Sequence, residues 1–154
     1  MITVSISRQI LIHRRPNGVR VQYPVSTAAK GSGNTRGSLQ TPLGRHRIAA
    51  LIGENAPCGT IFTARQPVGI FDEETNDPKE DWILSRILRL EGTQTGINRR
   101  GQVDTFSRYI YIHGTHRSDI IGQPASHGCI RMLNEDVIDL FAHTREGEIV
   151  YIRP

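Results

Sequence analysis

Apolar and polar residues alternate over the first 25 residues of the chain, which is the pattern of half-buried strands. The apolar positions are 4, 6, 10 and 12 and, beyond Asn17-Gly18, positions 19, 21, 23 and 25. Asn-Gly suits a type I′ turn, because both central residues of that turn need a positive φ. This region therefore predicts a β-hairpin that reverses at Asn17-Gly18.

Four further segments have the composition of strands. Apolar, β-branched and aromatic residues favour strands over residues 48–52, 61–71, 83–90 and 108–113, although the third segment also fits a helical spacing. In the fourth segment, alternation places Tyr109, Tyr111 and His113 on one face. Residues 28–44 are rich in Gly, Ser, Thr and Asn and predict a long surface loop with room to line a site. Residues 71–81 form an acidic surface excursion.

One convincing helix is predicted near the C-terminus. Asn134 is suited to cap it, Glu135 and Asp136 favour the positive end of the helix dipole, and apolar positions 137, 140 and 141 form a stripe. We expect Gly147 to end the helix before a final strand over residues 148–152. The pattern predicts one mostly β domain over residues 1–154, with one notable helix.

Charge and hydropathy narrow the possible partners. The chain has 19 Lys and Arg against 15 Asp and Glu, a net charge of +4 that favours an anionic partner. Nucleic acid and a carboxylate-rich polymer are both candidates, but no nucleic-acid-binding module is recognisable, so we do not expect nucleic acid to be the partner. No window reaches the roughly 18 uninterrupted apolar residues of a membrane-spanning helix. The first residues also lack the features of a secretory signal.

The two cysteines lie in different contexts. Cys58 follows Ala56-Pro57 in a loop-like stretch, where an inert thiol is expected, and one disulfide bridge to Cys129 remains formally possible. Cys129 is flanked by histidines at positions 113 and 127. A catalytic cysteine needs a base within reach and amide donors for the developing oxyanion. His113 can be that base, and Gly128 allows a tight turn before Cys129 that would direct amides inward.

The segment Ile-His-Gly-Thr at residues 112–115, followed by Ser-His-Gly-Cys-Ile-Arg-Met at residues 126–132, resembles the active-site signature of L,D-transpeptidase catalytic domains, the YkuD-like family. Thr-Pro-Leu-Gly at residues 41–44 is similar to the Thr-Pro-x-Gly element of that family. The resemblance covers nearly the whole chain. It implies a β-rich, sandwich- or barrel-like fold and a cysteine acyltransferase that uses neither metal nor cofactor.

The resemblance also implies a reaction and roles for individual residues. Cys129 would attack the carbonyl of a diamino acid followed by D-alanine in a peptidoglycan stem peptide. His113 would act as the base, and the Gly114 carbonyl would orient its imidazole. An amine of a second stem would resolve the thioacyl enzyme to a 3→3 cross-link. Further residues are expected in the oxyanion site or in substrate binding: Ser126, His127, Gly128, Arg131 and Tyr111.

Several alternatives remain open from the sequence. Water could take the acyl group in place of an amine, which would make the protein a carboxypeptidase or endopeptidase, or the domain could bind the cell wall without catalysis. His113, His116, His127 and Cys129 could form a zinc site, although His116 is better interpreted as a solvent-facing loop residue. Arg131 could pair with Glu135 or Asp136 instead of binding a substrate carboxylate. The family implies the cell envelope as the location, yet no export signal is visible.

Overall fold

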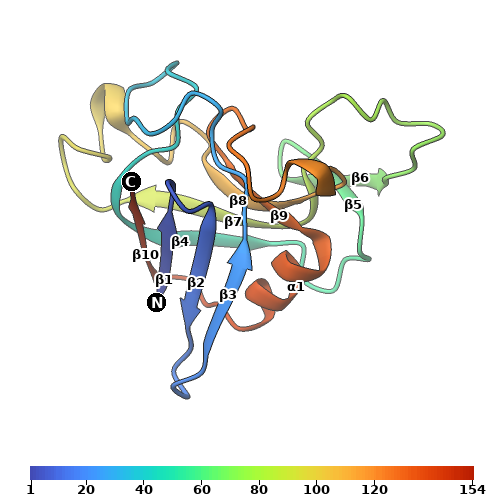
Figure 1. The fold of residues 1–154 in the computed structure, drawn as a ribbon, viewed down its shortest axis with the longest axis horizontal. Coiled ribbons are helices and arrows are strands. Elements are labelled where there is room, and N and C mark those ends of the chain that lie inside the picture. The colour runs from blue at the N-terminus through green and yellow to red at the C-terminus, as the bar shows by residue number, and fades with distance from the viewer.

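One curled sheet of ten strands is the main element of the computed structural model, which describes residues 1–154 (Figure 1). The strands are β1 (Ile2–Ser5), β2 (Ile10–Arg14), β3 (Arg20–Pro24), β4 (Gly44–Ile52), β5 (Thr60–Thr63), β6 (Gln66–Ile70), β7 (Leu84–Gly92), β8 (Tyr111–Thr115), β9 (Ile130–Leu133) and β10 (Ile149–Arg153). The helix α1 (Asn134–Ala142) and two short 3₁₀ turns, η1 (Gly101–Val103) and η2 (Ser118–Ile120), complete the elements. The predicted mostly β fold with one helix near the C-terminus is confirmed.

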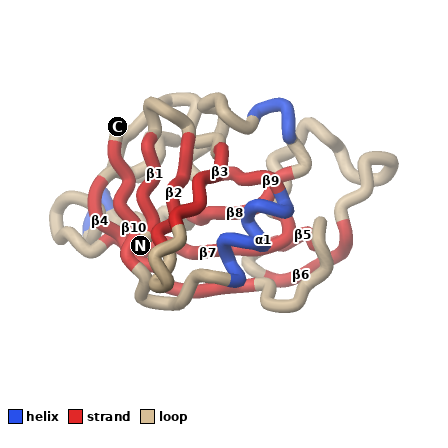
Figure 2. Tube along the Cα trace, turned by 60° about the horizontal axis from the view of Figure 1, so that its bottom comes forward, coloured by secondary structure: helices blue, strands red, loops and turns tan.

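The sheet folds over on itself, so that β1, β2, β3 and β10 run across the direction of β4 and β7 (Figure 1). The strand order is β3-β2-β1-β10-β4-β7-β5-β6, and β8 and β9 continue from β7 as a branch. Figure 2 shows α1 lying against β7, β8 and β9. A main core of 17 buried residues fills the space that these elements enclose. No helix of the structure is long and apolar enough to cross a membrane.

The predicted hairpin is confirmed as β2 and β3, but its predicted turn type is wrong. The amide of Gly18 donates to the Arg15 carbonyl at 3.0 Å, and the amide of Arg15 donates to the Val19 carbonyl at 2.9 Å. Within the turn only Gly18 has a positive φ, of 84°, whereas a type I′ turn would require one at Asn17 as well. Pro16 favours the first central position of a type I turn, so the loop has three residues and ends at a left-handed glycine.

The predicted strand over residues 61–71 is two strands, β5 and β6. They reverse at Ala64 and Arg65, whose φ values of 46° and 67° are those of a two-residue primed turn. Residues 48–52 are a strand as predicted, within β4, and the predicted strand over residues 83–90 begins one residue later, because β7 covers Leu84–Gly92.

The fourth predicted strand begins later and ends later than expected, because β8 covers Tyr111–Thr115. Tyr109 lies in a preceding turn with a φ of 55° and is 54% exposed, so it does not share a face with Tyr111 and His113. Ile112 is buried in the main core, whereas Tyr111 belongs to a second small apolar cluster with Phe62 and Ile87. The strand therefore presents Tyr111 and His113 away from the main core.

The predicted helix is confirmed, but both of its predicted ends are wrong. Asn134 is the first helical residue, and its Oδ1 accepts a hydrogen bond from Ser85 Oγ at 2.7 Å instead of capping the helix. The helix ends at Ala142, and Gly147 lies in the turn before β10 with a φ of 84°. Asn134 thereby ties the start of α1 to β7, at the back of β8.

Candidate active site

Two neighbouring parallel strands bring the two halves of the sequence signature together. In the β8–β9 ladder, Ile112 faces Ile130 and His113 faces Arg131. One residue earlier, the amide of Tyr111 donates to Cys129 Sγ at 3.4 Å. Since side chains alternate along a strand, Tyr111, His113, Cys129 and Arg131 lie on the same side of the sheet. A thiol, an imidazole and a guanidinium therefore share this surface.

His113 is fixed in one tautomer by its neighbour. Its Nδ1 lies 2.8 Å from the carbonyl oxygen of Gly114. Because a carbonyl can only accept, Nδ1 carries the proton and Nε2 presents a lone pair. Burial lowers the pKa of His113, and Arg131 lowers it further, against the opposing effects of Asp81 and the Gly114 carbonyl. The imidazole is therefore neutral at neutral pH and able to accept a proton.

Gly114 occupies a position where no side chain fits. A Cβ atom there would lie 2.6 Å from the Leu84 carbonyl oxygen and would also collide with the side-chain oxygen of Asn134. Val137 Cγ1 would be 3.2 Å away. The glycine therefore lets β8 lie directly against β7 and α1, which places the carbonyl that holds the His113 ring.

The thiol of Cys129 is protonated in the resting structure. Burial raises its pKa to about 11, and Asp81 adds to this effect, while the Tyr111 amide, Arg131 and Arg108 oppose it. Sγ also lies 3.5 Å from the carbonyl oxygen of Tyr109, which accepts the thiol proton. No hydrogen bond joins Sγ to His113, and such contacts often close only when substrate binds. Chemistry at this thiol requires a base.

The turn before Cys129 is organised by Ser126. Its Oγ donates to the Cys129 carbonyl at 2.6 Å and accepts the amide of Gly128 at 3.2 Å. Gly128 has a φ of 133°, in the region that favours glycine. The Gly128 amide is thus occupied by Ser126, whereas the amides of His127 and Cys129 make no hydrogen bond within the protein. These two N–H groups are therefore free to donate to a bound molecule.

The loop over residues 28–44 closes on the same turn. It is a loop as predicted, but Ala28 and Thr41 within it are fully buried. Thr41 Oγ1 donates to the Gly128 carbonyl at 3.0 Å and accepts the Ala28 amide at 3.0 Å. The resemblance of residues 41–44 to a family element pointed to this segment without giving the contact. Thr41 therefore binds the Gly128 carbonyl, while Ser126 binds the Gly128 amide.

Arg108 also lies near the Cys129 thiol, and the sequence patterns did not point to it. Its guanidinium donates to the Gln40 carbonyl at 2.6 Å and to the Gly33 carbonyl at 3.2 Å. It also lies close enough to Cys129 for its charge to favour the thiolate. Arg108 precedes the turn at Tyr109, and no sequence motif marked it.

Arg131 forms an ion pair, but not with Glu135 or Asp136, the partners that the sequence left open. Arg131 Nη2 lies 2.7 Å from Asp81 Oδ2, and neither Glu135 nor Asp136 pairs with it. The reason is the strand alternation: Arg131 points to the side of His113, whereas α1 packs into the main core on the opposite side. Asp81 comes from the end of the acidic excursion, where the sequence suggested only a solvated surface.

His127 and Tyr111 differ in their exposure to solvent. The side chain of His127 is 70% exposed, with Nδ1 4.0 Å from Asp81 Oδ2. Tyr111 is only 5% exposed and packs against Cys129, and its hydroxyl accepts a hydrogen bond from Arg65 at 3.1 Å. His127 can contact a bound molecule directly, while Tyr111 supports the thiol from beneath.

His116 is not the solvent-facing residue that we expected. Its Nε2 donates to the Pro78 carbonyl at 2.8 Å, and its ring stacks on Phe71 with centroids 4.3 Å apart. These contacts turn His116 toward the excursion over residues 71–81.

No three His, Cys, Asp or Glu side chains are grouped so that they could hold a metal ion. Cys58 and Cys129 are both free thiols, so the possible disulfide is not formed.

Comparison with known proteins identifies the family. The family model of the L,D-transpeptidase catalytic domain, YkuD, matches residues 1–152. YqjB of Bacillus subtilis (strain 168), provisionally named an L,D-transpeptidase, is 44% identical over 48 residues, which are 31% of this chain and 27% of that protein.

Solved structures share the fold. An L,D-transpeptidase from Mycobacterium smegmatis has 13% identity and a TM-score of 0.57, covering 99% of this chain and 58% of its own. L,D-transpeptidase 3 from Mycobacterium tuberculosis, in complex with a faropenem-derived adduct, has 19% identity and a TM-score of 0.58, with 99% and 59% covered. A mutant of the Enterococcus faecium L,D-transpeptidase has 14% identity and a TM-score of 0.59, with 99% and 48% covered.

The chain spans roughly half to three-fifths of these solved chains and about a quarter of YqjB. At these identities the structural likeness establishes a common fold, and the match of the family model over residues 1–152 establishes the relationship. The chain belongs to the YkuD family of L,D-transpeptidase catalytic domains.

Proposed function

We propose that the protein is a peptidoglycan L,D-transpeptidase that works through a thioacyl enzyme on Cys129. The observation that carries the proposal is the shared face of β8 and β9, which carries both a neutral His113 with a free Nε2 and the Cys129 thiol. A neutral base and a protonated thiol suit proton transfer during attack, rather than a preformed ion pair.

In the first half-reaction, Cys129 Sγ attacks the carbonyl carbon of the diamino acid that precedes D-alanine, while His113 Nε2 takes the thiol proton. The carbonyl oxygen becomes negative and is stabilised by the amides of His127 and Cys129. The intermediate then collapses by breaking the bond to the D-alanine nitrogen. His113 returns its proton to that nitrogen, so D-alanine leaves as a neutral amine and a thioester remains.

In the second half-reaction, the side-chain amine of another stem attacks the thioester carbonyl. His113 removes a proton from the attacking amine and returns it to the departing thiolate of Cys129. The product is a 3→3 cross-link, and the free enzyme is regenerated. If water attacks instead, the same steps release a stem shortened by D-alanine. Since peptidoglycan lies outside the cytoplasmic membrane, we propose the cell envelope as the place of action.

Arg131 and Asp81 give the site a means of recognising acidic substrates. A guanidinium binds a carboxylate with two parallel hydrogen bonds, and here Asp81 already occupies one edge of Arg131. We propose that a stem-peptide carboxylate is held next to this pair. The net charge of +4 supports attraction of an anionic polymer.

The proposal is tested with purified protein and disaccharide-tetrapeptide stems, with products weighed by mass spectrometry. We expect cross-linked dimers with loss of one D-alanine per bond, together with a covalent adduct on Cys129 after exposure to a carbapenem. Cys129→Ala should abolish both, whereas Cys58→Ala, which removes the other free thiol, should abolish neither. Stems shortened without dimers would assign hydrolysis instead. Activity that survives in Cys129→Ala would contradict the proposal.

A further inference from the structure

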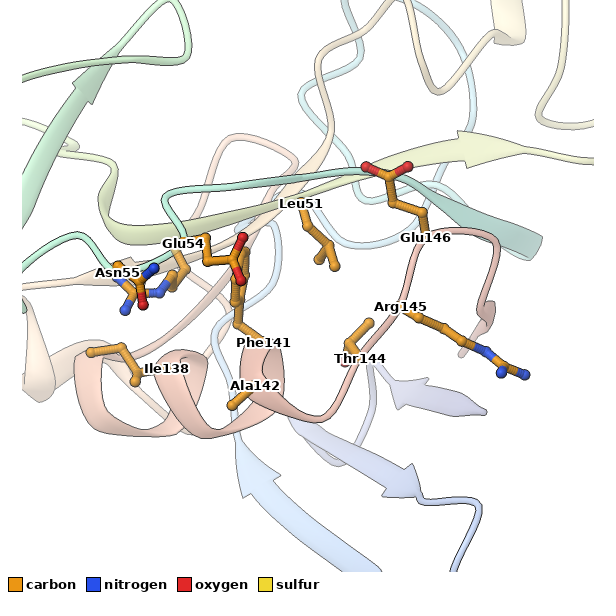
Figure 3. Close-up of a pocket in the computed structure, with 10 residues that line it drawn as sticks. Leu51, Glu54, Asn55, Ile138, Phe141, Ala142, Thr144, Arg145 and Glu146 are labelled. Carbon is orange, nitrogen blue, oxygen red and sulfur yellow. The ribbon is translucent and has the colours of Figure 1, made fainter.

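A large open pocket lies away from Cys129, between the end of β4 and the helix α1 (Figure 3). Its volume is about 620 Å³, within the range of small-molecule sites. The lining residues are Leu51, Glu54, Asn55, Arg86, Ile138, Phe141, Ala142, Thr144, Arg145 and Glu146. None of them takes part in the proposed acyl transfer.

Arg86 is the unusual residue of this pocket, because its charge is buried without an anionic partner. The residue is only 8% exposed, and no carboxylate lies within 4.0 Å of its guanidinium. Nη1 donates to the carbonyls of Ala56 at 2.8 Å and Ser85 at 2.6 Å. Nε and Nη2 make no hydrogen bond within the protein. Buried charges are normally paired, so this guanidinium is an open position for an anion.

The pocket is on the opposite side of the sheet from the catalytic face. Arg86 lies over the ring of Phe141, with 5.4 Å between the guanidinium carbon and the ring centroid, and Phe141 belongs to the main core. The next residue, Ile87, faces His113 in the β7–β8 ladder and packs in the second apolar cluster. A ligand at Arg86 therefore would not compete for the space around Cys129.

The other lining groups indicate what kind of anion fits. Figure 3 shows the carboxylate of Glu54 extending toward Phe141, while the guanidinium of Arg145 points away from the other labelled side chains. Glu54 is exposed and makes no ion pair, so its charge is also available. Leu51 and Ala142 add apolar surface. The lining thus carries two guanidinium groups, Arg86 and Arg145, two carboxylates, Glu54 and Glu146, and an apolar wall, and Arg86 is the buried charge among them.

We propose that this pocket binds a small zwitterion with an apolar side chain, an α-amino acid or a dipeptide. The carboxylate would bind Arg86, the ammonium group would bind Glu54, and the side chain would pack on Leu51 and Phe141. A bidentate contact from Nε and Nη2 uses the two donor positions that the protein leaves free. The ligand would supply the anion that the buried guanidinium lacks.

The test is a titration of isotope-labelled protein followed through its backbone amide NMR signals. The probes are leucine, the dipeptide leucyl-leucine, 4-methylpentanoate, which has no amine, and 3-methylbutylamine, which has no carboxylate. We expect saturable shifts at residues 51–55 and 138–146 with leucine or the dipeptide. The two half-ligands should bind at least about tenfold more weakly, the effect of losing one charge-assisted hydrogen bond.

Two variants and a control decide the outcome. Arg86→Met should weaken leucine binding at least about tenfold. Glu54→Gln, an exposed change, should weaken leucine but not 4-methylpentanoate, and it remains decisive if Arg86→Met does not fold. Glu73→Gln, in the exposed excursion, should not change the binding of any of the four probes.

The proposal is overturned if leucine and the dipeptide give no saturable shifts, or if 4-methylpentanoate binds the unaltered protein as tightly as leucine. Cys129→Ala should bind leucine normally, so this test is independent of acyl transfer.

Discussion

The carboxylate of Asp81 lies 2.7 Å from the guanidinium of Arg131, on the side of the sheet that also carries His113 and Cys129. The two charges act in opposite directions on the same two groups. Asp81 raises the pKa values of His113 and Cys129, and Arg131 lowers both. Burial has the largest effect on both pKa values, and because Asp81 belongs to a loop and Arg131 to a strand, the position of that loop adds to or subtracts from it.

Asp81→Asn should therefore move the pH profile of the reaction. Removing the carboxylate lowers the pKa of His113, and a base is active in its deprotonated form, so the acid limb of kcat/KM should shift to lower pH. The measurement is kcat/KM for stem-peptide turnover across the acid range. Asp81→Glu, which keeps the charge, should retain the original limb. An acid limb that stays in place in Asp81→Asn, or moves upward, would show that Asp81 does not act on His113.

Alkylation should report the raised pKa of the Cys129 thiol. Since that pKa is about 11, the thiolate fraction, and with it the rate of reaction with iodoacetamide, should climb about tenfold per pH unit across the neutral and mildly alkaline range. Peptide mass spectrometry resolves Cys129 from the exposed Cys58, which serves as an internal reference. A rate at Cys129 that levels off near neutral pH would mean a preformed thiolate and would contradict the proposed role of His113 as a general base.

Ser126→Ala should lower kcat while leaving the fold intact. The hydroxyl holds both the Gly128 amide and the Cys129 carbonyl, so its loss frees the turn that presents the oxyanion donors. We expect kcat to fall about tenfold or more, because the variant loses both hydrogen bonds that order this turn. Ser118→Ala, an exposed serine of η2, is the matched control. Unchanged kcat in Ser126→Ala would indicate that the turn is rigid without the hydroxyl.

Gly114→Ala should destabilise the protein by about 2–3 kcal/mol, because the added Cβ atom would lie 2.6 Å from the Leu84 carbonyl oxygen. Urea denaturation measures the change in the free energy of unfolding. Gly37→Ala provides the comparison, since nothing lies within 4 Å of a Cβ at that position and only its positive φ opposes the change. Its cost should be about 1 kcal/mol. Equal losses in the two variants would show that β8 can move away from β7.

Glu148→Gln should lower the free energy of unfolding at neutral pH, by an amount that decreases as the pH falls. Burial opposes ionisation of Glu148, but hydrogen bonds from His13 and the Met1 ammonium group lower its pKa to about 2. A depressed folded-state pKa stabilises the protein above the unfolded pKa, near 4.5, and this contribution disappears as pH falls toward 2. The variant should be less stable by a few kcal/mol at neutral pH, with the difference shrinking between about pH 5 and pH 2. Denaturation curves across that range provide the check, and a difference independent of pH would refute it.

The sequence predicted the elements whose signals are local. Alternation identified the strands, and the apolar stripe at Val137, Leu140 and Phe141 identified the helix, because each pattern reflects burial of one face. The turn at Ala64-Arg65 escaped prediction, since neither residue is typical of a positive φ and the pairing of β5 with β6 imposes it. The caps of α1 were also misjudged, because Asn134 is engaged by Ser85 of a distant strand.

In the candidate site, too, local sequence patterns predicted some residues, whereas tertiary contacts determine the positions of others. Strand alternation alone grouped Tyr111 with His113, and the ladder of β8 with β9 then added Cys129 and Arg131. Asp81 could not be found in this way, because it approaches from a loop whose path depends on contacts such as that of His116 with Pro78. The position of a residue that follows the two-residue alternation of a strand can be predicted from sequence. The position of a residue that depends on the conformation of a loop requires the structure.

The parallel pairing of β8 with β9 has a further consequence for how the protein could misfold. A slip of β9 by one residue along β8 would exchange its two faces, moving Cys129 into the interior and expelling Ile130 and Met132, both fully buried. The misaligned form would lose the burial of two large apolar side chains, which costs several kcal/mol. The misregistered form is therefore much less stable than the native one. Burial of Ile130 and Met132 in the main core thus fixes the register that places Cys129 and Arg131 on the other face of the sheet.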